Sequence, residues 1–404
     1  MRIALVSEHA NPLAALGGAD AGGQNVHVAC LALQIAKLGH SVIVYTRRDN
    51  TDSPARSPMG PVVVEQVPAG PPARIPKDDL FPFMPEFAER LADRWDVFRP
   101  DIVHAHFWMS GMASVRAATL TGTPVVQTYH ALGTVKKRHQ GADDTSPACR
   151  ISVERDIGWA CDQIIATCRD EVLELSRMGI DSEQVSIVPC GVDLDRFGPA
   201  GPRADRGGAR HRLLAIGRLV PRKGFDTAIE ALAGLPDTEL VIAGGPAPRE
   251  LAADPQARRL RELAEARGLA DRVHLTGGVP RELMPALIRS ADVVVCTPWY
   301  EPFGIVPLEA MASGKPVVAS AVGGLTDTVL DGVTGALVPP KNAPALVAAL
   351  VPLLGDPALR RRAGRSGLFR ARTRYGWPQI AQETVDIYAR VVARRNVLTK
   401  AVNR

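Results

Sequence analysis

Two consecutive series of short apolar strands, each followed by a loop and a helical segment, constrain this chain most strongly. The first series opens with an apolar segment at 2–7, a glycine-rich segment at 17–23, helical spacing over 26–38 and a second apolar segment at 41–46. Strand, loop, helix and strand in this order predict a right-handed βαβ unit in a parallel sheet covered on both faces. Further strands of this series are predicted at 102–104, 124–128, 164–167 and 185–188.

The second series follows a stretch, 198–210, that lacks periodicity, is rich in glycine and proline, and is predicted to be a linker. Strands are expected at 213–216, 239–243, 272–275, 292–296 and 316–319, with helical segments such as 225–234 and 257–267 between them. Two such series predict an α/β protein of two facing Rossmann-like domains with an interdomain cleft. We expect the domains at 1–197 and 211–375, and a C-terminal helix and basic tail at 376–404 that could pack back on the N-terminal domain.

The charge of the chain is unevenly distributed. Of the net charge of +5 over 404 residues, the segment from Arg360 onward carries +10 and the first 359 residues carry −5. A uniformly basic nucleic-acid-binding protein would not show this asymmetry, so we expect no nucleic-acid partner. The arginine run at 360–365 favours a solvated helix face, with contact to an anionic membrane as the alternative.

The compartment is predicted from what the sequence lacks. No window approaches the roughly 20 continuous apolar residues of a membrane span, and the apolar start at 3–6 is too short for a signal peptide. The six cysteines form no C-x-x-C pair and have no regular spacing, which is typical of reduced thiols. A cytoplasmic protein is expected.

A pair of carboxylates flanks the predicted start of a helix in the second series. Glu301 and Glu309 bound the segment EPFGIVPLE, which follows a strand, and a helix beginning near Gly304 would direct free N–H groups towards phosphate oxygens. The two carboxylates could then accept hydrogen bonds from hydroxyl groups on different parts of one ligand. This pattern suits a nucleotide sugar, and the alternative is one surface acid and one acid that interacts with the helix dipole.

Cations and glycines occupy other strand ends. Arg218 and Lys223 lie in the loop GRLVPRKG at 217–224, where two cations can neutralise a diphosphate; two solvated loop cations are the alternative. In the first series, Gly22 and Gly23 would let the backbone approach a ligand where a helix begins. This glycine-rich loop lacks the G-x-G-x-x-G order of a dinucleotide-binding motif.

Taken together, these motifs resemble the retaining glycosyltransferases of family 4, which have the GT-B fold. The resemblance rests on the segments at 301–309, 217–224, 17–25, 104–111, 128–133 and 188–193 and extends from residue 1 to about 385. Within that family the chain is similar to the group of mycothiol-pathway inositol-phosphate N-acetylglucosaminyltransferases, sucrose-phosphate synthases and sucrose synthases.

The resemblance implies a donor site for a nucleotide sugar in the C-terminal domain, with a UDP-sugar first and a GDP-sugar second. The implied catalytic residues are His130, Arg218, Lys223 and Glu301. By the resemblance, Arg218 and Lys223 would bind the diphosphate, and Gly23 would lie beside the phosphate. The transferred sugar would be bound by His130, Glu301 and the backbone of Phe303, Gly304 and Ile305. Glu309 would bind the ribose, and the segment around Val279 would bind the base.

The resemblance also implies an acceptor site in the N-terminal domain, where the chain departs from the inositol-phosphate enzymes. Lys77 and Arg150 match residues that bind the acceptor phosphate, but Phe107 and Ala131 replace a tyrosine and a threonine that assist them. Asn25 and Lys136 complete the implied acceptor-binding set. The acceptor is therefore either a phosphorylated small molecule, held with help from the basic cluster at 136–138, or an unrelated acceptor such as a natural-product or lipid intermediate.

The implied chemistry is front-face transfer, in which the departing phosphate accepts the proton of the acceptor and no carboxylate nucleophile is needed. The sequence has no D-x-D metal motif, because Asp143 and Asp144 lie in a polar loop, so neither a metal nor a cofactor is expected. Two other classes remain as alternatives. One is a nucleotide-sugar epimerase with the same fold, and the other is a non-enzymatic protein that binds a membrane or nucleic acid through the basic tail. A homodimer is compatible with the sequence, which leaves the oligomeric state open.

Overall fold

The structure is a computed structural model that describes residues 1–14 and 22–402, except for the side chains of 398–402. Most of the glycine-rich segment at 17–23 therefore lies outside the described residues. The chain divides into two compact units: one holds the residues up to Pro189 together with the segment from Trp377, and the other holds Cys190–Gly376. Each unit is described by itself.

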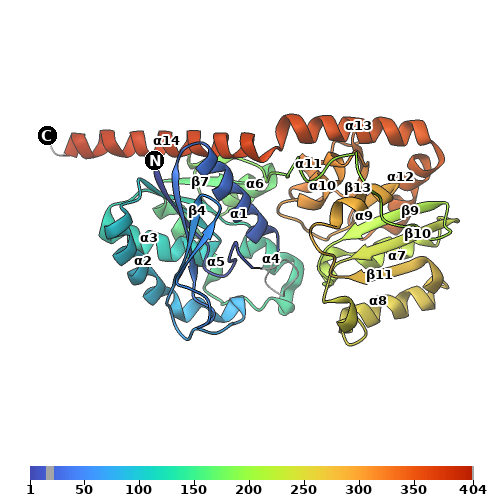
Figure 1. Ribbon diagram of the computed structural model, residues 1–404, viewed down its shortest axis with the longest axis horizontal. Coiled ribbons are helices and arrows are strands. Elements are labelled where there is room, and N and C mark those ends of the chain that lie inside the picture. The colour runs from blue at the N-terminus through green and yellow to red at the C-terminus, as the bar shows by residue number, and fades with distance from the viewer. Residues whose placement is uncertain (15–21, 403–404) are drawn as a thin grey trace. The chain divides into compact units, whose positions relative to one another are not determined.

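The first unit is built on an eight-stranded sheet with the order β3-β4-β2-β1-β5-β6-β7-β8, in which only β3 runs antiparallel to its neighbour (Figure 1). Its strands are β1 (Arg2–Val6), β2 (Ser41–Arg47), β3 (Arg56–Met59), β4 (Val62–Val67), β5 (Ile102–His106), β6 (Val125–Thr128), β7 (Gln163–Ala166) and β8 (Val185–Ile187). The order reverses between β1 and β5. In open α/β sheets, ligands bind beside the carboxyl ends of the strands at such a reversal.

Helices cover this sheet through apolar faces with helical spacing. They are α1 (Gly23–Lys37), α2 (Met84–Phe98), α3 (Trp108–Thr121), α4 (Gly133–Gln140), α5 (Arg150–Ala160) and α6 (Arg169–Arg177). In α2 the residues Phe87, Leu91 and Trp95 are four apart and completely or almost completely buried. Each such side chain stabilises the fold by about 1.5–3 kcal/mol, so the helix is held to the core by one stripe.

The second unit is a six-stranded, wholly parallel sheet with the order β11-β10-β9-β12-β13-β14 (Figure 1). Its strands are β9 (His211–Ile216), β10 (Thr238–Ala243), β11 (Val273–Gly277), β12 (Val293–Cys296), β13 (Val317–Ser320) and β14 (Gly335–Val338). Its helices are α7 (Phe225–Leu232), α8 (Pro255–Ala266), α9 (Met284–Ser290), α10 (Ile305–Ala312), α11 (Leu325–Thr328), α12 (Ala343–Gly355) and α13 (Pro357–Arg374). The reversal of strand order lies between β9 and β12.

The segment predicted as a linker packs on the second unit. The unit begins at Cys190 rather than after residue 197, because Val192 and Phe197 are buried in its core. Within 198–210, the amide of Ala204 and the carbonyl of Pro202 form hydrogen bonds of 3.0 and 2.8 Å with α9. These contacts involve the backbone, and hydrophobic periodicity therefore does not reveal them.

The C-terminal helix α14 (Trp377–Val402) belongs to the first unit, where it lies along α1 (Figure 1). The ring of Trp377 packs edge-on against His27 of α1, with 5.4 Å between ring centroids. Further along the helix, the hydroxyl of Tyr388 lies 2.7 Å from Nδ1 of His104 in β5. Arg395 forms an ion pair of 2.5 Å with Asp162. The last helix of the chain thus contacts α1, β5 and the residue that precedes β7.

Several elements escaped the sequence analysis, among them β3, β4 and β14. In β4 the apolar run is interrupted by Glu65, which is nevertheless buried because Arg56 and Arg94 each approach it to 2.8 Å. Sequence analysis predicts that a charged residue within a strand lies at the surface unless its partners are known. Both arginines come from other elements, β3 and α2, which only the fold brings to β4.

Some arginines of the basic C-terminal segment bind the chain itself. Arg360 donates hydrogen bonds of 2.9 and 3.0 Å to the carbonyls of Leu353 and Leu354 at the end of α12. Arg370 donates to the carbonyls of Asp327 and Thr328. These side chains satisfy carbonyl groups at helix ends, a role that needs no external partner.

No single helix among the described residues is long and apolar enough to cross a bilayer. Taken together, α12 and α13, with a bend of 104° between them, have the length and composition of a broken span.

Candidate active site

In the second unit, the predicted donor residues gather where the strand order reverses. Lys223 ends a short 3-10 turn (Pro221–Lys223) after β9, and Glu301 follows the adjacent strand β12. The ammonium group of Lys223 and the carboxylate of Glu301 form an ion pair across the two loops. Arg218 lies in the same loop as Lys223 and is exposed. The structure therefore brings Lys223 and Glu301 together at the position where α/β sheets bind ligands.

The loop that carries Lys223 is fixed against the end of β12. The amide of Trp299 donates to the carbonyl of Arg222 at 2.8 Å, and the hydroxyl of Thr297 donates to the carbonyl of Gly224, also at 2.8 Å. Gly224 has a φ of +65°, and a Cβ atom there would overlap the carbonyl oxygen of Thr297. Glycine is required both by the backbone conformation and by this close approach.

The carboxyl group of Glu301 is ionised by its surroundings. Burial alone would raise its pKa, but the charges of Lys223 and Arg222 and the hydrogen bonds from Lys223 and the amide of Phe303 outweigh burial and lower the pKa below the ordinary value. A fixed negative charge at neutral pH can accept hydrogen bonds from sugar hydroxyl groups.

Helix α10 begins four residues after Glu301. Gly304 is its N-cap, with a φ of +79°, and Ile305 is its first residue. The preceding loop is held by the amide of Gly324, which donates to the carbonyl of Glu301 at 2.9 Å. The first N–H groups of α10 thus follow closely after Glu301 in the chain, and the sugar-binding role of the backbone of Phe303, Gly304 and Ile305 stays a prediction. A helix N-terminus of this kind attracts phosphate.

Glu309 has a partner that the sequence analysis missed. It lies on α10, is 2% exposed and forms an ion pair of 2.5 Å with Arg281. Burial raises the pKa of Glu309, and Arg281 opposes this rise. Arg281 also lies 4.9 Å from the ring centroid of Phe197 and two residues after the partly buried Val279. Glu309 and the Val279 segment are therefore neighbours through Arg281.

In the first unit, His130 belongs to a cluster of buried histidines at the ends of β5 and β6. Its Nε2 lies 2.9 Å from Nδ1 of His106, and the two rings are stacked. The ring of His27 meets His130 edge-on at 5.1 Å. The ring centroid of His104 lies 4.1 Å from that of His106, and Nε2 of His104 forms a hydrogen bond of 2.8 Å with Thr128. Sequence analysis singled out His130 alone, because the other members lie in two other segments of the chain.

These histidines are neutral at pH 7. Burial lowers the pKa of His27 to about 4. Burial also lowers the pKa of His130 well below its ordinary value, and the nearby imidazoles of His27, His104 and His9 lower it further. A neutral imidazole both donates and accepts hydrogen bonds, so His130 is suited to bind a hydroxyl group rather than to supply positive charge.

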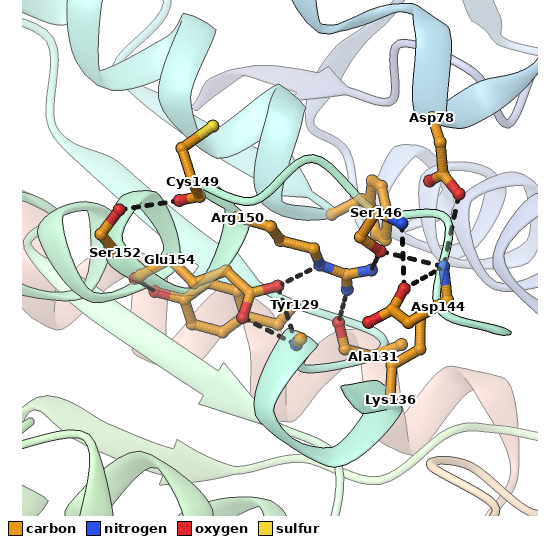
Figure 2. Close-up of polar contacts among 12 residues, drawn as sticks. Asp78, Tyr129, Ala131, Lys136, Asp144, Ser146, Cys149, Arg150, Ser152 and Glu154 are labelled. Carbon is orange, nitrogen blue, oxygen red and sulfur yellow. Dashed lines mark hydrogen bonds and ion pairs between the residues drawn. The ribbon is translucent and has the colours of Figure 1, made fainter. Parts of the chain in front are cut away.

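His130 is held in a left-handed backbone conformation, with a φ of +63°, by contacts from α5 to the residues around it. Arg150 donates to the carbonyl of Ala131 at 2.6 Å, and the carboxylate of Glu154 accepts from the amide of Gly133 at 2.8 Å (Figure 2). The hydroxyl of Tyr129 donates to the carbonyl of Glu154 at 2.6 Å. The surrounding contacts thus determine a backbone conformation that costs about 1–3 kcal/mol.

The cations predicted to bind an acceptor phosphate already face carboxylates. Arg150 pairs with Glu154 at 2.7 Å. Lys136 lies 2.9 Å from Asp144 and 3.3 Å from Asp78, and Lys77 lies 2.8 Å from Asp78 (Figure 2 shows all of these residues except Lys77). Asp144, which the sequence placed in a polar loop, and Asp78, which it missed, therefore neutralise the two lysines.

Phe107 connects this charged network with the histidine cluster. It has a φ of +85° and lies 4% exposed between Lys77 and Arg150, whose cationic groups are 5.8 and 5.1 Å from its ring centroid. It follows His106 directly at the end of β5. An aromatic ring under two cations offers an apolar contact where the resemblance implied a hydroxyl donor.

Asn25 and Gly23 lie at the start of α1. The side-chain oxygen of Asn25 accepts from the amide of Gly22 at 3.0 Å, and its amide group donates to the carbonyl of Asn11 at 2.9 Å. Gly23 is the first residue of the helix. Asn25 therefore fixes the segment at 22–25, while the rest of the glycine-rich loop lies outside the described residues.

Within 1–14 and 22–402, no group of three or more His, Cys, Asp or Glu side chains is arranged to hold a metal ion. All six cysteines are free thiols.

Comparison with known proteins gives matches over nearly the whole chain. Residues 21–196 match the family described as Glycosyltransferase Family 4, and residues 206–368 match Glycosyl transferases group 1. A D-inositol 3-phosphate glycosyltransferase of Streptomyces bingchenggensis is 36% identical over 96% of this chain and 89% of its own length. The chain is a family 4 glycosyltransferase.

Further relatives of this glycosyltransferase agree in fold. A D-inositol 3-phosphate glycosyltransferase of Xylanimonas cellulosilytica is 36% identical over 98% of both chains. The solved structure of sucrose-phosphate synthase from Thermosynechococcus elongatus is 33% identical, with a TM-score of 0.89 over 97% of this chain and 99% of its own. The predicted fold class, two parallel-sheet Rossmann-like domains of the GT-B type, is confirmed, and so are the family and the glycosyl-transfer activity.

Proposed function

We propose that this glycosyltransferase moves a sugar from a UDP-sugar to a hydroxyl group of a small polyol or sugar acceptor, with retention of anomeric configuration and without a metal ion. The observation that carries the proposal is the Lys223–Glu301 pair beside the N-terminus of α10. It places a cation and helix N–H groups, which suit a diphosphate, next to a fixed carboxylate, which suits sugar hydroxyl groups.

The proposed reaction uses the chain's own charges. The acceptor oxygen bonds to the anomeric carbon while the bond from that carbon to the diphosphate breaks and leaves its electron pair on the phosphate oxygen. The acceptor proton passes to the departing diphosphate. Lys223, Arg218 and the first N–H groups of α10 stabilise the charge that develops there. Glu301 orients the transferred sugar.

A polyol or sugar acceptor is proposed from the relatives and from the charges of the first unit. The curated relatives are named for an inositol phosphate, and the structural relative for a sucrose phosphate. In this chain Lys77 and Lys136 share Asp78, so an acceptor phosphate would compete with that carboxylate. An acceptor that binds through hydroxyl groups does not compete with Asp78 for these lysines.

Thermal stabilisation by nucleotides and a product assay test the proposal. A nucleotide present at about 100 times its dissociation constant stabilises the protein by roughly 2.7 kcal/mol. At one common concentration, we expect UDP to stabilise this protein more than GDP or ADP does. UDP release from UDP-glucose or UDP-N-acetylglucosamine should then depend on myo-inositol, 1D-myo-inositol 3-phosphate or fructose 6-phosphate, persist in EDTA and yield an α-linked product. Selective stabilisation by GDP would overturn the UDP-sugar donor. Inhibition by EDTA would overturn the metal-independent reaction, and a β-linked product would overturn retention of configuration.

A further inference from the structure

Helix α13 of the second unit is basic along its whole length. Arginine occupies seven of its 18 positions, at 360, 361, 362, 365, 370, 372 and 374, and no position holds an acid. The acid that precedes the helix, Asp356, is its N-cap, and its carboxylate accepts hydrogen bonds from the amides of Ala358 and Leu359 at 2.7 and 3.1 Å. The positive charge of α13 is therefore not balanced within the helix.

The packing of α13 fixes which of its sides points outward. The helix lies along the outside of the second unit (Figure 1), and its buried positions are Ala363, Gly364, Gly367 and Ala371. A Cβ atom on Gly364 would overlap the carbonyl oxygen of Gly314, and one on Gly367 would press against Met311 of α10. Because small residues let α13 approach its unit this closely, the helix cannot turn about its own axis.

Five residues on the outward side form a stripe, which we call the α13 stripe: Arg361, Arg362, Arg365, Phe369 and Arg372. At about 3.6 residues per turn, these positions lie within an arc of about 100°. All five are exposed, and Phe369 is 70% exposed. Among the residues that the structure describes, none forms a hydrogen bond or an ion pair with the side chains of these four arginines.

The arginines of the stripe differ in this respect from two others on the same helix. Arg360 and Arg370 donate hydrogen bonds to backbone carbonyls at the ends of α12 and α11. Within the stripe, Arg365 lies four residues after Arg361 and three after Arg362, and like charges at these spacings repel each other on a helix surface. The stripe therefore weakens the fold slightly, and its residue types favour a contact outside the chain.

An anionic lipid bilayer has the chemistry and the shape that suit this stripe. A helix of 18 residues is about 27 Å long, and its outward side can lie along a flat surface. Guanidinium groups bind phosphate oxygens through paired hydrogen bonds, and a phenyl ring beside them reaches the apolar layer under the headgroups. Clusters of four or more basic residues on such a helix are typical of binding to anionic lipids. A nucleic-acid duplex offers phosphates but no apolar layer for the ring.

We propose that the α13 stripe is a docking surface for an anionic lipid bilayer, where the four arginines bind lipid phosphates and Phe369 inserts between the headgroups. The inference goes beyond the proposed function, because docking needs neither a donor nor an acceptor. No residue of the stripe belongs to the site of Lys223 and Glu301. UDP binding should therefore be the same in the wild type and in variants of the stripe.

Sedimentation of the full chain with lipid vesicles tests the charge of the stripe. We expect binding to vesicles of phosphatidylcholine mixed with an equal amount of phosphatidylglycerol, no binding to phosphatidylcholine alone, and an affinity that falls as salt is added. Arg365→Gln should lower the affinity about fivefold, as for one cation near an anionic surface. Arg258→Gln, which removes an exposed arginine of α8 in the same unit, should leave it nearly unchanged. Equal losses in these two variants, or no binding of the wild type to mixed vesicles, would overturn the inference.

A second comparison tests the bilayer against other polyanions. Phe369→Leu and Phe369→Ser keep the charge of the stripe, but only the leucine keeps an apolar side chain. On mixed vesicles we expect the leucine variant to bind nearly as well as the wild type and the serine variant more weakly. A single-stranded oligonucleotide at the same concentration of phosphate groups should not displace the protein from the vesicles. Displacement, or equal affinity of the two variants, would overturn the bilayer as the occupant.

Thermal stabilisation by UDP separates this inference from the proposed function. It also shows that each variant is folded, since no stripe residue lies in the proposed donor site. If the wild type binds mixed vesicles but does not respond to UDP, the proposed donor fails and the docking surface stands. If the wild type responds to UDP but does not bind mixed vesicles, the docking surface fails and the proposed function stands.

Discussion

Arg150 donates a hydrogen bond of 2.6 Å to the carbonyl oxygen of Ala131, the residue that follows His130. The same guanidinium pairs with Glu154 and donates to the hydroxyl of Ser146 at 3.1 Å, and the side chain is only 2% exposed. A residue that the resemblance assigned to an acceptor phosphate therefore also supports the loop of His130, to which the resemblance assigned the transferred sugar. Its substitution would affect both.

Removing one partner of the buried Arg150–Glu154 pair should destabilise the first unit strongly. Arg150→Met leaves Glu154, which is 0% exposed, without its cation, and such losses cost about 3–5 kcal/mol. The double variant with Glu154→Met should recover most of that loss. Arg395→Met, at an ion pair whose arginine is 48% exposed, should cost less than about 1 kcal/mol. Urea unfolding measures all three, and equal losses in Arg150→Met and Arg395→Met would contradict the expectation.

Two glycines with the same φ of +65° offer a matched test of the donor loop. Gly224→Ala brings a Cβ against the carbonyl of Thr297, whereas Gly268→Ala meets nothing within 4 Å. Both should lose about 1–2 kcal/mol of stability from the left-handed backbone. Only Gly224→Ala should also displace Lys223 and weaken UDP binding, as measured by calorimetry. Equal UDP affinity in the two variants would show that this loop does not form the donor site.

Lys223 should act mainly on turnover. Lys223→Met removes a cation from the developing diphosphate charge, and the loss of one such donor typically lowers kcat about 10²- to 10³-fold. It should also raise the pKa of Glu301, because Lys223 is the first of the charges that lower it. Lys223→Arg keeps the charge and should retain more activity. Steady-state kinetics with saturating donor measures the kcat of each variant. Equal kcat values for Lys223→Met and Lys223→Arg would rule out an electrostatic role of Lys223.

His27 should make the first unit sensitive to acid. Its pKa is about 4 in the folded chain, against an ordinary value of 6.5. Because the unfolded chain binds the proton first, the free energy of unfolding should fall as the pH drops from about 6.5 to 4, by about 1.4 kcal/mol per pH unit for this residue. His27→Phe keeps an aromatic ring against Trp377 and should remove the contribution of this residue to the slope. Urea unfolding at pH 7.5 and 5.5 measures it, and a slope equal to that of the wild type would count against burial of a neutral imidazole.

Asp78 should control the response to phosphorylated acceptors. Burial alone would raise its pKa, but Lys77, Thr145 and Lys136 outweigh burial and lower it, so the group is charged at neutral pH. Asp78→Asn leaves Lys77 and Lys136 with less negative charge and should lower the KM for 1D-myo-inositol 3-phosphate while leaving that for myo-inositol nearly unchanged. A parallel change for both acceptors would exclude a phosphate-specific effect.

The repeated strands and loops made the fold class predictable, because a parallel sheet covered on both faces leaves a simple apolar pattern. The motif around Glu301 and Lys223 was predictable for a similar reason: both residues lie in loops that follow strands adjacent in the sheet. Charged strands such as β4 escaped, since the arginines that neutralise Glu65 lie elsewhere in the chain. The packing of 198–210 escaped because backbone hydrogen bonds leave no residue pattern.

The sequence by itself determined the two parallel sheets, the family and the loops that carry the donor residues. Only the tertiary structure decided the partners of the buried and charged side chains: Arg281 for Glu309, Asp78 for Lys136, and His106 for His130. The physical reason is that apolar periodicity is a local property of a segment. The pairing of buried charges and imidazoles depends instead on which strand ends the fold brings together, and residues far apart in the chain become neighbours only there.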